Sequence, residues 1–158
     1  MDDNIYTIIR LLNSLTHVSL DDFQNRLRLQ KLAYLAREMG CNCGFAFDWY
    51  VRGPYSPSLT RALFAAQELE GLTMTNVKLN EEEAIISQNI RELVGKDMDD
   101  PRALELLASV WYFLPHFPIS EEAMIYQIDR LIECKPQFSR KEIEQTFERI
   151  IKFREKRK

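Results

Sequence analysis

The residues that could bind a metal ion or act as nucleophiles are few in this chain. Of the three cysteines, Cys41 and Cys43 form a C-x-C pair, and the third is Cys134. A structural zinc site needs four closely spaced ligands, whereas the only two histidines, His17 and His116, have no metal-ligand spacing to the pair. The spacing therefore predicts no metal site. An odd number of cysteines also favours free thiols in a reducing compartment.

The sequence also contains no recognisable catalytic signature. Only five glycines occur, and none belongs to a phosphate-binding loop or to the G-x-S-x-G turn of a hydrolase. The acidic clusters at 81–83, 97–100 and 121–122 each lie where a helix is expected to begin, so attraction to the helix dipole explains them without catalysis. We therefore predict that the protein is not an enzyme and that it uses no cofactor.

The strongest candidate for binding is the aromatic stretch at 49–59, WYVRGPYSPSL. Gly53 and Pro54 are a turn signal. Ser56 is a good helix N-cap, and Pro57 then occupies the first helical position, where its missing N–H costs nothing. Backbone geometry alone accounts for these four positions, and we assign them to the scaffold.

Backbone geometry does not account for Trp49, Arg52 and Tyr55. A turn displays its flanking side chains at the surface, and these residue types are enriched at the energetic centres of protein interfaces. We therefore predict that they contact a partner. Gln30, in an apolar run of the preceding helix, is assigned to the scaffold instead, because a buried amide needs partners and the carbonyls of the turn could supply them.

The elements that must position these residues are mostly helices. Amphipathic periods and end signals predict helices over 5–15, 19–39, 56–70, 80–94, 100–114, 120–134 and from 139 onward. Asn80 with Glu83 and Ser139 with Glu142 have the spacing of capping boxes. In the second helix Ser19 is the expected N-cap, with Asp21 and Asp22 in the first turn and Phe23 and Leu27 on the buried face.

Two other segments are expected to be strands. Aromatic and apolar residues alternate with other residues over 44–51, which is the period of a strand. Residues 72–79, LTMTNVKL, are prone to extended structure, and we expect them to pair with the first segment. The predicted fold is thus mainly α, a single compact domain over 1–158 with six to seven helices and a small two-stranded β element.

Composition and charge limit the possible partners. The chain of 158 residues is 46% hydrophobic and 28% charged, with no apolar run long enough for a membrane span. Its net charge of −3 argues against a protein whose main task is to bind nucleic acid, although residues 152–158 are locally basic. The acidic N-terminus is unlike a secretory signal, so we expect a cytoplasmic protein.

Two segments in order resemble a known family. Residues 27–36, LRLQKLAYLA, resemble the K-L-Q-K-L-x-Y helix of the Panacea antitoxin-domain family and related phage-associated proteins. Residues 47–59 are similar to that family's aromatic strand, which ends in Y-G-P-[VY]-[SP]-x-x-L, although Val51 and Arg52 stand where the family usually has a tyrosine. The resemblance covers 27–63. The residues that match the family's signature are Gln30, Lys31, Trp49, Arg52 and Tyr55.

The resemblance implies a helical domain that acts by binding another protein, typically a toxin encoded alongside, and that is not an enzyme. The leading hypothesis is therefore an antitoxin-like or phage-associated interaction module whose contact residues are Arg52, Tyr55, Trp49 and Lys31. We expect joint replacement of Arg52 and Tyr55 by alanine to weaken partner binding while the melting temperature barely changes.

The alternative is a winged-helix DNA-binding regulator, which the order helix, helix, strand, helix and then a possible hairpin supports. Such a regulator should present a basic recognition helix. The helix over 56–70 has only Arg61 against Glu68 and Glu70, so nucleic acid is not the favoured partner.

Overall fold

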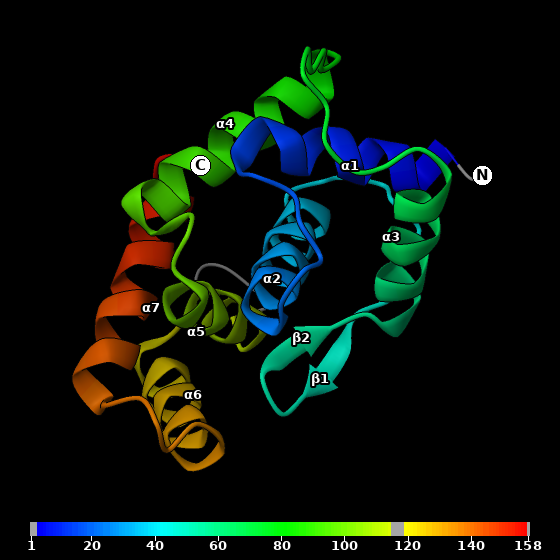
Figure 1. Ribbon diagram of the computed structural model, residues 1–158. Helices are drawn as coiled ribbons and strands as arrows, with labels where there is room; N and C mark the ends of the chain where they lie inside the picture. The colour runs from blue at the N-terminus through cyan, green and yellow to red at the C-terminus, as the bar shows by residue number, and fades with distance from the viewer. Residues whose placement is uncertain (1–2, 115–118, 158) are drawn as a thin grey trace. The chain divides into compact units, whose positions relative to one another are not determined.

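In a computed structural model, which describes residues 3–114 and 119–157, the chain forms seven α-helices, one short 3-10 helix and one two-stranded sheet (Figure 1). This confirms the predicted mainly α fold with a small β element. None of the helices within the described ranges is long and apolar enough to cross a membrane.

The contacts divide the chain into two compact units, unit 1 up to Glu105 and unit 2 from Leu106 onward. Unit 1 contains α1 (Asp3–Leu15), α2 (Phe23–Glu38), β1 (Asp48–Tyr50), β2 (Gly53–Tyr55), α3 (Pro57–Leu69), α4 (Glu81–Val94) and η1 (Gly95–Asp97). Unit 2 contains α6 (Glu121–Cys134) and α7 (Arg140–Glu155). The boundary falls within α5 (Pro101–Tyr112), and the expectation of a single domain stays a prediction.

Helix α2 is the centre of unit 1. It contacts α1, α3, α4 and β2, and Figure 1 shows α1 running across α2 and α3. Every residue from Leu27 to Ala36 is buried, so this part of the helix has no solvent face. Because the burial surrounds the helix, the polar side chains within this segment must find partners inside the protein.

The other helices of unit 1 turn their apolar stripes inward, as predicted. The buried residues include Ile5, Ile8, Ile9 and Leu12 of α1, Leu59, Leu63 and Ala66 of α3, and Ile86, Ile90 and Leu93 of α4. Helix starts are also confirmed where the cap is local: Ser56 accepts from the Leu59 N–H, and Asn80 with Glu83 forms a complete capping box.

The predicted start of α2 is wrong by several residues. The N-cap is Asp22, whose carboxylate accepts the Asn25 N–H at 2.7 Å, while the Ser19 hydroxyl accepts the Asp21 N–H at 3.1 Å. The helix therefore begins at Phe23, and Asp22 rather than the equally competent Ser19 is the cap. Phe23 itself is 47% exposed rather than buried, because it stands ahead of the segment that the other elements surround.

The predicted strand pairing is also wrong. The sheet is an antiparallel hairpin of β1 and β2, with Asp48 opposite Tyr55 and Trp49 opposite Pro54. The turn falls before Gly53, at residues 51–52, and Gly53 and Pro54 belong to the second strand.

Residues 72–79, the expected pairing partner, form no strand. They are held instead by a side chain of α1, because Asn13 donates to the Leu72 carbonyl at 2.8 Å and accepts the Met74 N–H at 3.0 Å. A single amide thus satisfies backbone groups that a sheet would have paired.

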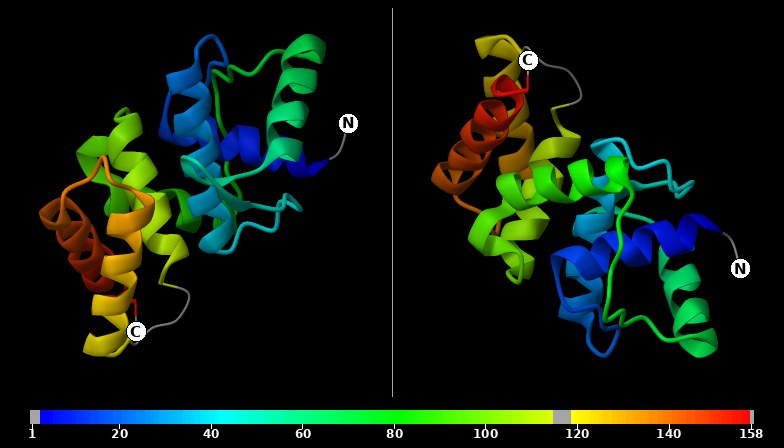
Figure 2. Two further views of the ribbon diagram at one scale, coloured as in Figure 1. Left: turned by 90° about the horizontal axis from the view of Figure 1, so that it is seen from below. Right: turned by 90° about the horizontal axis from the view of Figure 1, so that it is seen from above.

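Unit 2 has its own apolar core. Figure 2 shows α6 and α7 side by side, and they bury Ile128, Leu131, Ile143, Phe147, Ile150 and Phe153. Ser120 caps α6, and Ser139 with Glu142 forms the predicted capping box of α7.

The end of α5 and the segment that follows it are joined to α7. Trp111 meets Phe153 edge to face at 6.2 Å, and Arg154 donates to the Leu114 carbonyl at 2.7 Å. His116 lies outside the described residues, and His17 is exposed.

Candidate partner-binding pocket

The hairpin that carries the aromatic stretch is shaped by one glycine. Val51 and Arg52 do not have positive φ, whereas Gly53 has φ +92°, which is the pattern of an ordinary turn followed by a glycine bulge. A residue with a Cβ would be strained at this angle. The glycine therefore lets Val51 and Arg52 occupy the exposed tip of the hairpin.

A single glutamine joins the end of the hairpin to α2. The side chain of Gln30 accepts the Ser56 N–H at 3.0 Å and donates to the Ser56 carbonyl at 2.8 Å. The same amide nitrogen donates to the Thr60 hydroxyl at 2.7 Å, and that hydroxyl lies 3.0 Å from the Tyr55 hydroxyl. The amide thus bonds the backbone of the α3 N-cap residue rather than the carbonyls of the predicted turn.

Lys31 lies inside unit 1. Its side chain is fully buried, and its ammonium donates to the Pro54 carbonyl at 2.5 Å. A buried ammonium is tolerated only when it is hydrogen-bonded or paired. In this structure the predicted contact residue therefore supports the hairpin from beneath and is not presented at the outer surface.

The two predicted aromatic contacts lie on different faces of the hairpin. Successive residues of a strand point to opposite faces, so Trp49 and Tyr50 diverge. Tyr50 packs edge to face on Tyr55 with ring centroids 5.3 Å apart. Tyr55 is half-buried by this packing and by its bond to Thr60, so it is both part of the scaffold and accessible at one edge.

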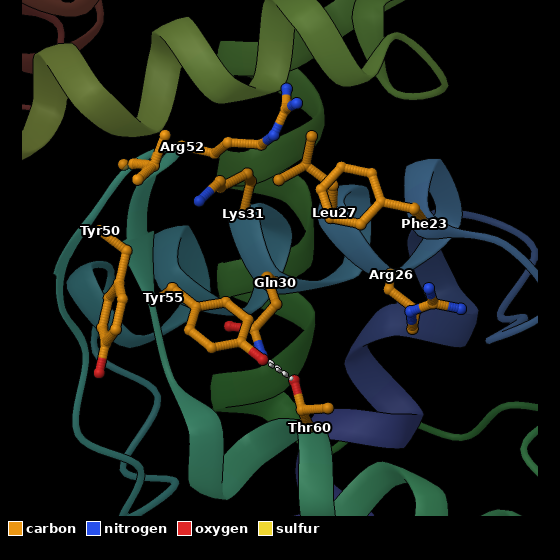
Figure 3. A pocket seen from close by; sticks show the side chains of 11 residues that line it. Phe23, Arg26, Leu27, Gln30, Lys31, Tyr50, Arg52, Tyr55 and Thr60 are labelled. Carbon is orange, nitrogen blue, oxygen red and sulfur yellow. Dashed lines mark hydrogen bonds between the residues drawn. The ribbon is translucent and has the colours of Figure 1, made fainter.

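These side chains border a pocket of about 390 Å³ in unit 1 (Figure 3). Its walls come from the first three turns of α2, from the hairpin and from the first turn of α3. Figure 3 places Phe23 and Leu27 next to Arg52, with Tyr50 and Tyr55 on the other side. The volume falls within the range of ligand sites, near its lower end.

Arg52 stands at the rim of this pocket. Its guanidinium lies over the Phe23 ring, 5.0 Å from the centroid, and one of its nitrogens is 3.8 Å from the Glu105 carboxylate. The side chain is still 54% exposed. It is thus oriented by an aromatic ring and a buried acid while remaining open to solvent.

The structure brings together most, but not all, of the residues singled out in the sequence. Gln30, Lys31, Arg52, Gly53 and Tyr55 line the pocket, and Pro54 and Ser56 supply backbone atoms to the first two. Trp49 does not line it.

Six lining residues were not predicted as part of the site: Phe23, Arg26, Leu27, Tyr50, Val51 and Thr60. The sequence signal for Thr60 was weak, since it lies one turn after the Ser56 cap and only its hydrogen bonds distinguish it. Arg26 lies one turn before the buried Gln30 on α2, and Phe23 lies two turns before it, so the helical spacing indicated a shared face.

The cysteine pair lies elsewhere in unit 1. Cys41 and Cys43 are both buried. A hydrogen bond between the two thiols, together with burial, raises the pKa of Cys41, and the same bond lowers the pKa of Cys43 to about 6. Among the described residues no group of three or more His, Cys, Asp or Glu side chains is placed to hold a metal ion.

Comparison of the chain with models of known protein families, with curated protein sequences and with solved structures gave no match. The resemblance of residues 27–63 to the Panacea family therefore stays a prediction.

Proposed function

We propose that the protein is a non-enzymatic interaction module that binds a partner protein through the hairpin tip and the adjoining pocket. One observation carries the proposal: large apolar side chains are exposed together around this pocket. Phe23 is 47% exposed, Tyr50 44% and Val51 90%. Apolar side chains gathered around a hollow are typical of interaction sites, and Arg52 among them is of a residue type enriched at the energetic centres of interfaces.

The support for a DNA-binding regulator is reduced. A wing should follow the third helix, but residues 72–79 form no strand and the hairpin precedes α3. The segment before α4 thus offers no second hairpin for a duplex groove, and we do not propose this function.

The resemblance of residues 27–63 implies that the partner is a toxin encoded alongside this chain. The free thiols Cys41, Cys43 and Cys134 agree with a cytoplasmic site of action. Co-expression tests this part of the proposal: the chain should restore growth to cells that produce the product of a neighbouring toxin-like reading frame.

Site-specific photocrosslinking tests the interaction surface. A photoreactive phenylalanine analogue placed at Val51 should crosslink one defined protein in native cells, and the same analogue at Ile85, which is exposed on α4, should not. The purified partner should then bind wild-type protein and bind Arg52→Ala less tightly. Crosslinking only to nucleic acid, or equally from both positions, would refute the proposed surface.

A further inference from the structure

The pocket has a charge that differs from that of the whole chain. Its eleven lining residues include three cations, Arg26, Lys31 and Arg52, and no aspartate or glutamate. The chain as a whole has a net charge of −3. The pocket is therefore a local basic site in an acidic protein, and opposite charges guide the choice of partner at interfaces.

The cations differ in what they offer to a ligand. Lys31 is buried against the Pro54 carbonyl, and Arg26 donates to the Leu20 carbonyl at 2.8 Å. Arg52 is the most exposed, and the buried Glu105 lies at one side of it. Because a guanidinium has several donors arranged in a plane, it can meet a second carboxylate from the solvent side.

The remaining walls are suited to an apolar group. Phe23 and Leu27 lie beside Arg52, and Tyr50 and Tyr55 lie across from them (Figure 3). The volume of about 390 Å³ accommodates one or two large side chains. At the floor, Gln30 and Thr60 already bond each other and Ser56, so they provide few hydrogen bonds to a polar ligand.

We propose that this pocket receives an acidic segment of the partner protein, with a large apolar side chain between Phe23 and Tyr50 and a neighbouring carboxylate on Arg52. The inference rests on the proposed function and names the chemistry of the partner. A chain segment fits better than a small free acid, because exposed Val51 and Tyr50 extend the apolar surface beyond the hollow, where a small ligand would leave them uncovered.

A nucleic acid fits the same surface poorly. Its phosphates call for several exposed cations along one face. Here Asp22 directly precedes Phe23, and Asp48 is paired with Tyr55 in the hairpin, and both carboxylates are exposed. A polyanion would meet these charges at the rim, whereas a short acidic segment need only contact Arg52.

Selection from a displayed library of random linear peptides tests the inference on the full chain without knowledge of the partner. We expect the enriched peptides to carry aspartate or glutamate next to an aromatic or large aliphatic residue. One enriched peptide, synthesised with a fluorescent label, should bind less tightly as the salt concentration rises. Failure to enrich any peptide, or enrichment of neutral or basic ones, would overturn the proposal.

Substitutions then locate the contacts. Arg52→Ala should weaken binding of the labelled peptide about tenfold, whereas Arg61→Ala, which removes the same charge from the exposed surface of α3, should not. Replacing the acidic residue of the peptide by its amide should cause no further loss in Arg52→Ala, as a direct pair requires. Independent losses would show that the carboxylate binds elsewhere.

The apolar half has its own matched pair of variants. Tyr50→Ala should weaken binding of the labelled peptide. Phe64→Ala, which removes a similarly exposed ring from α3, should leave that binding unchanged. If Tyr50→Ala and Phe64→Ala weaken peptide binding equally, the pocket is not the binding site. A free aromatic carboxylate that binds as tightly as the peptide would also contradict the proposed segment. If crosslinking at position 51 captures a partner whose contacting segment lacks acidic residues, this inference fails while the proposed function stands.

Discussion

At the scale of single residues, the site depends on polar side chains of α2 that point into the protein. Gln30 bonds both backbone groups of Ser56, a residue that is itself fully buried. The Ser56 carbonyl also accepts the Thr60 N–H at 3.3 Å, whereas the bond donated by the buried Ser56 N–H goes to Gln30. Gln30, which the sequence assigned to the scaffold, is therefore the residue that connects α2 to the start of α3.

We expect Gln30→Leu to lower the free energy of unfolding by about 1–3 kcal/mol, because it leaves the buried Ser56 N–H unpaired. The control is Gln24→Leu, the same change at an exposed position of α2. Chemical unfolding of both variants measures the difference. A similar loss of stability in the two variants would show that the hydrogen bonds between Gln30 and Ser56 contribute little.

Tyr55 calls for a change in the earlier expectation for the double alanine variant. Its ring packs on Tyr50 and its hydroxyl bonds Thr60, so removal of the side chain would also cost stability. Arg52→Ala alone is the cleaner probe, since half of that side chain is exposed and exposed ion pairs contribute little.

The cysteine pair gives a residue-scale prediction about pH. The bond donated within the pair favours the thiolate of Cys43, whose pKa is lowered to about 6. Ultraviolet absorbance should therefore show one thiolate forming near that pH in the wild type, and not in Cys43→Ala. Cys41→Ala should move the midpoint upward, because the donor is lost, whereas Cys134→Ala should leave it in place.

At the scale of elements, α1 and α4 are joined by a charged pair. Arg10 meets Glu83 at 2.8 Å, and Glu83 also accepts the Asn80 N–H of its own capping box. Burial alone would raise the pKa of Glu83, but the hydrogen bonds from Arg10 and Asn80 and the Arg10 charge outweigh it and hold the pKa below its ordinary value. The same carboxylate thus caps one helix and anchors another.

The sign of the pH dependence follows. Because the pKa of Glu83 is lower in the folded state, its contribution is present above the ordinary value of 4.5 and is lost as the pH falls below that value. Glu83→Gln should keep the cap and make stability less dependent on pH in this acidic range. Glu82→Gln, at the exposed neighbouring position, should leave the slope unchanged, and thermal unfolding at several pH values compares them.

At the scale of the whole molecule, the division into two compact units predicts two regions of separate stability. Phe147→Ala, which opens a cavity in the core of unit 2, should speed hydrogen exchange in α6 and α7 more than in α1 and α2. Leu63→Ala in the core of unit 1 should show the reverse. Uniform loss of protection in both variants would mean that the chain unfolds as one cooperative body.

Local features of the fold were predictable because their causes are local. The starts of α3, α4, α6 and α7 follow from a cap side chain that accepts the N–H of the residue three positions later. The buried stripes followed from helical spacing in the same way. The start of α2 was missed because Ser19 and Asp22 are both competent caps, and the sequence does not rank them by the packing of the loop.

The sequence by itself determined a mainly helical chain and the ends of most helices, because these depend on neighbours along the chain. Only the tertiary structure showed that residues 72–79 are bound to Asn13 instead of a strand, that Lys31 is buried under Pro54, and that Phe23 faces the hairpin across a pocket. Each of these features depends on residues that lie far apart in the chain. Such contacts leave no periodic pattern in the segments that make them.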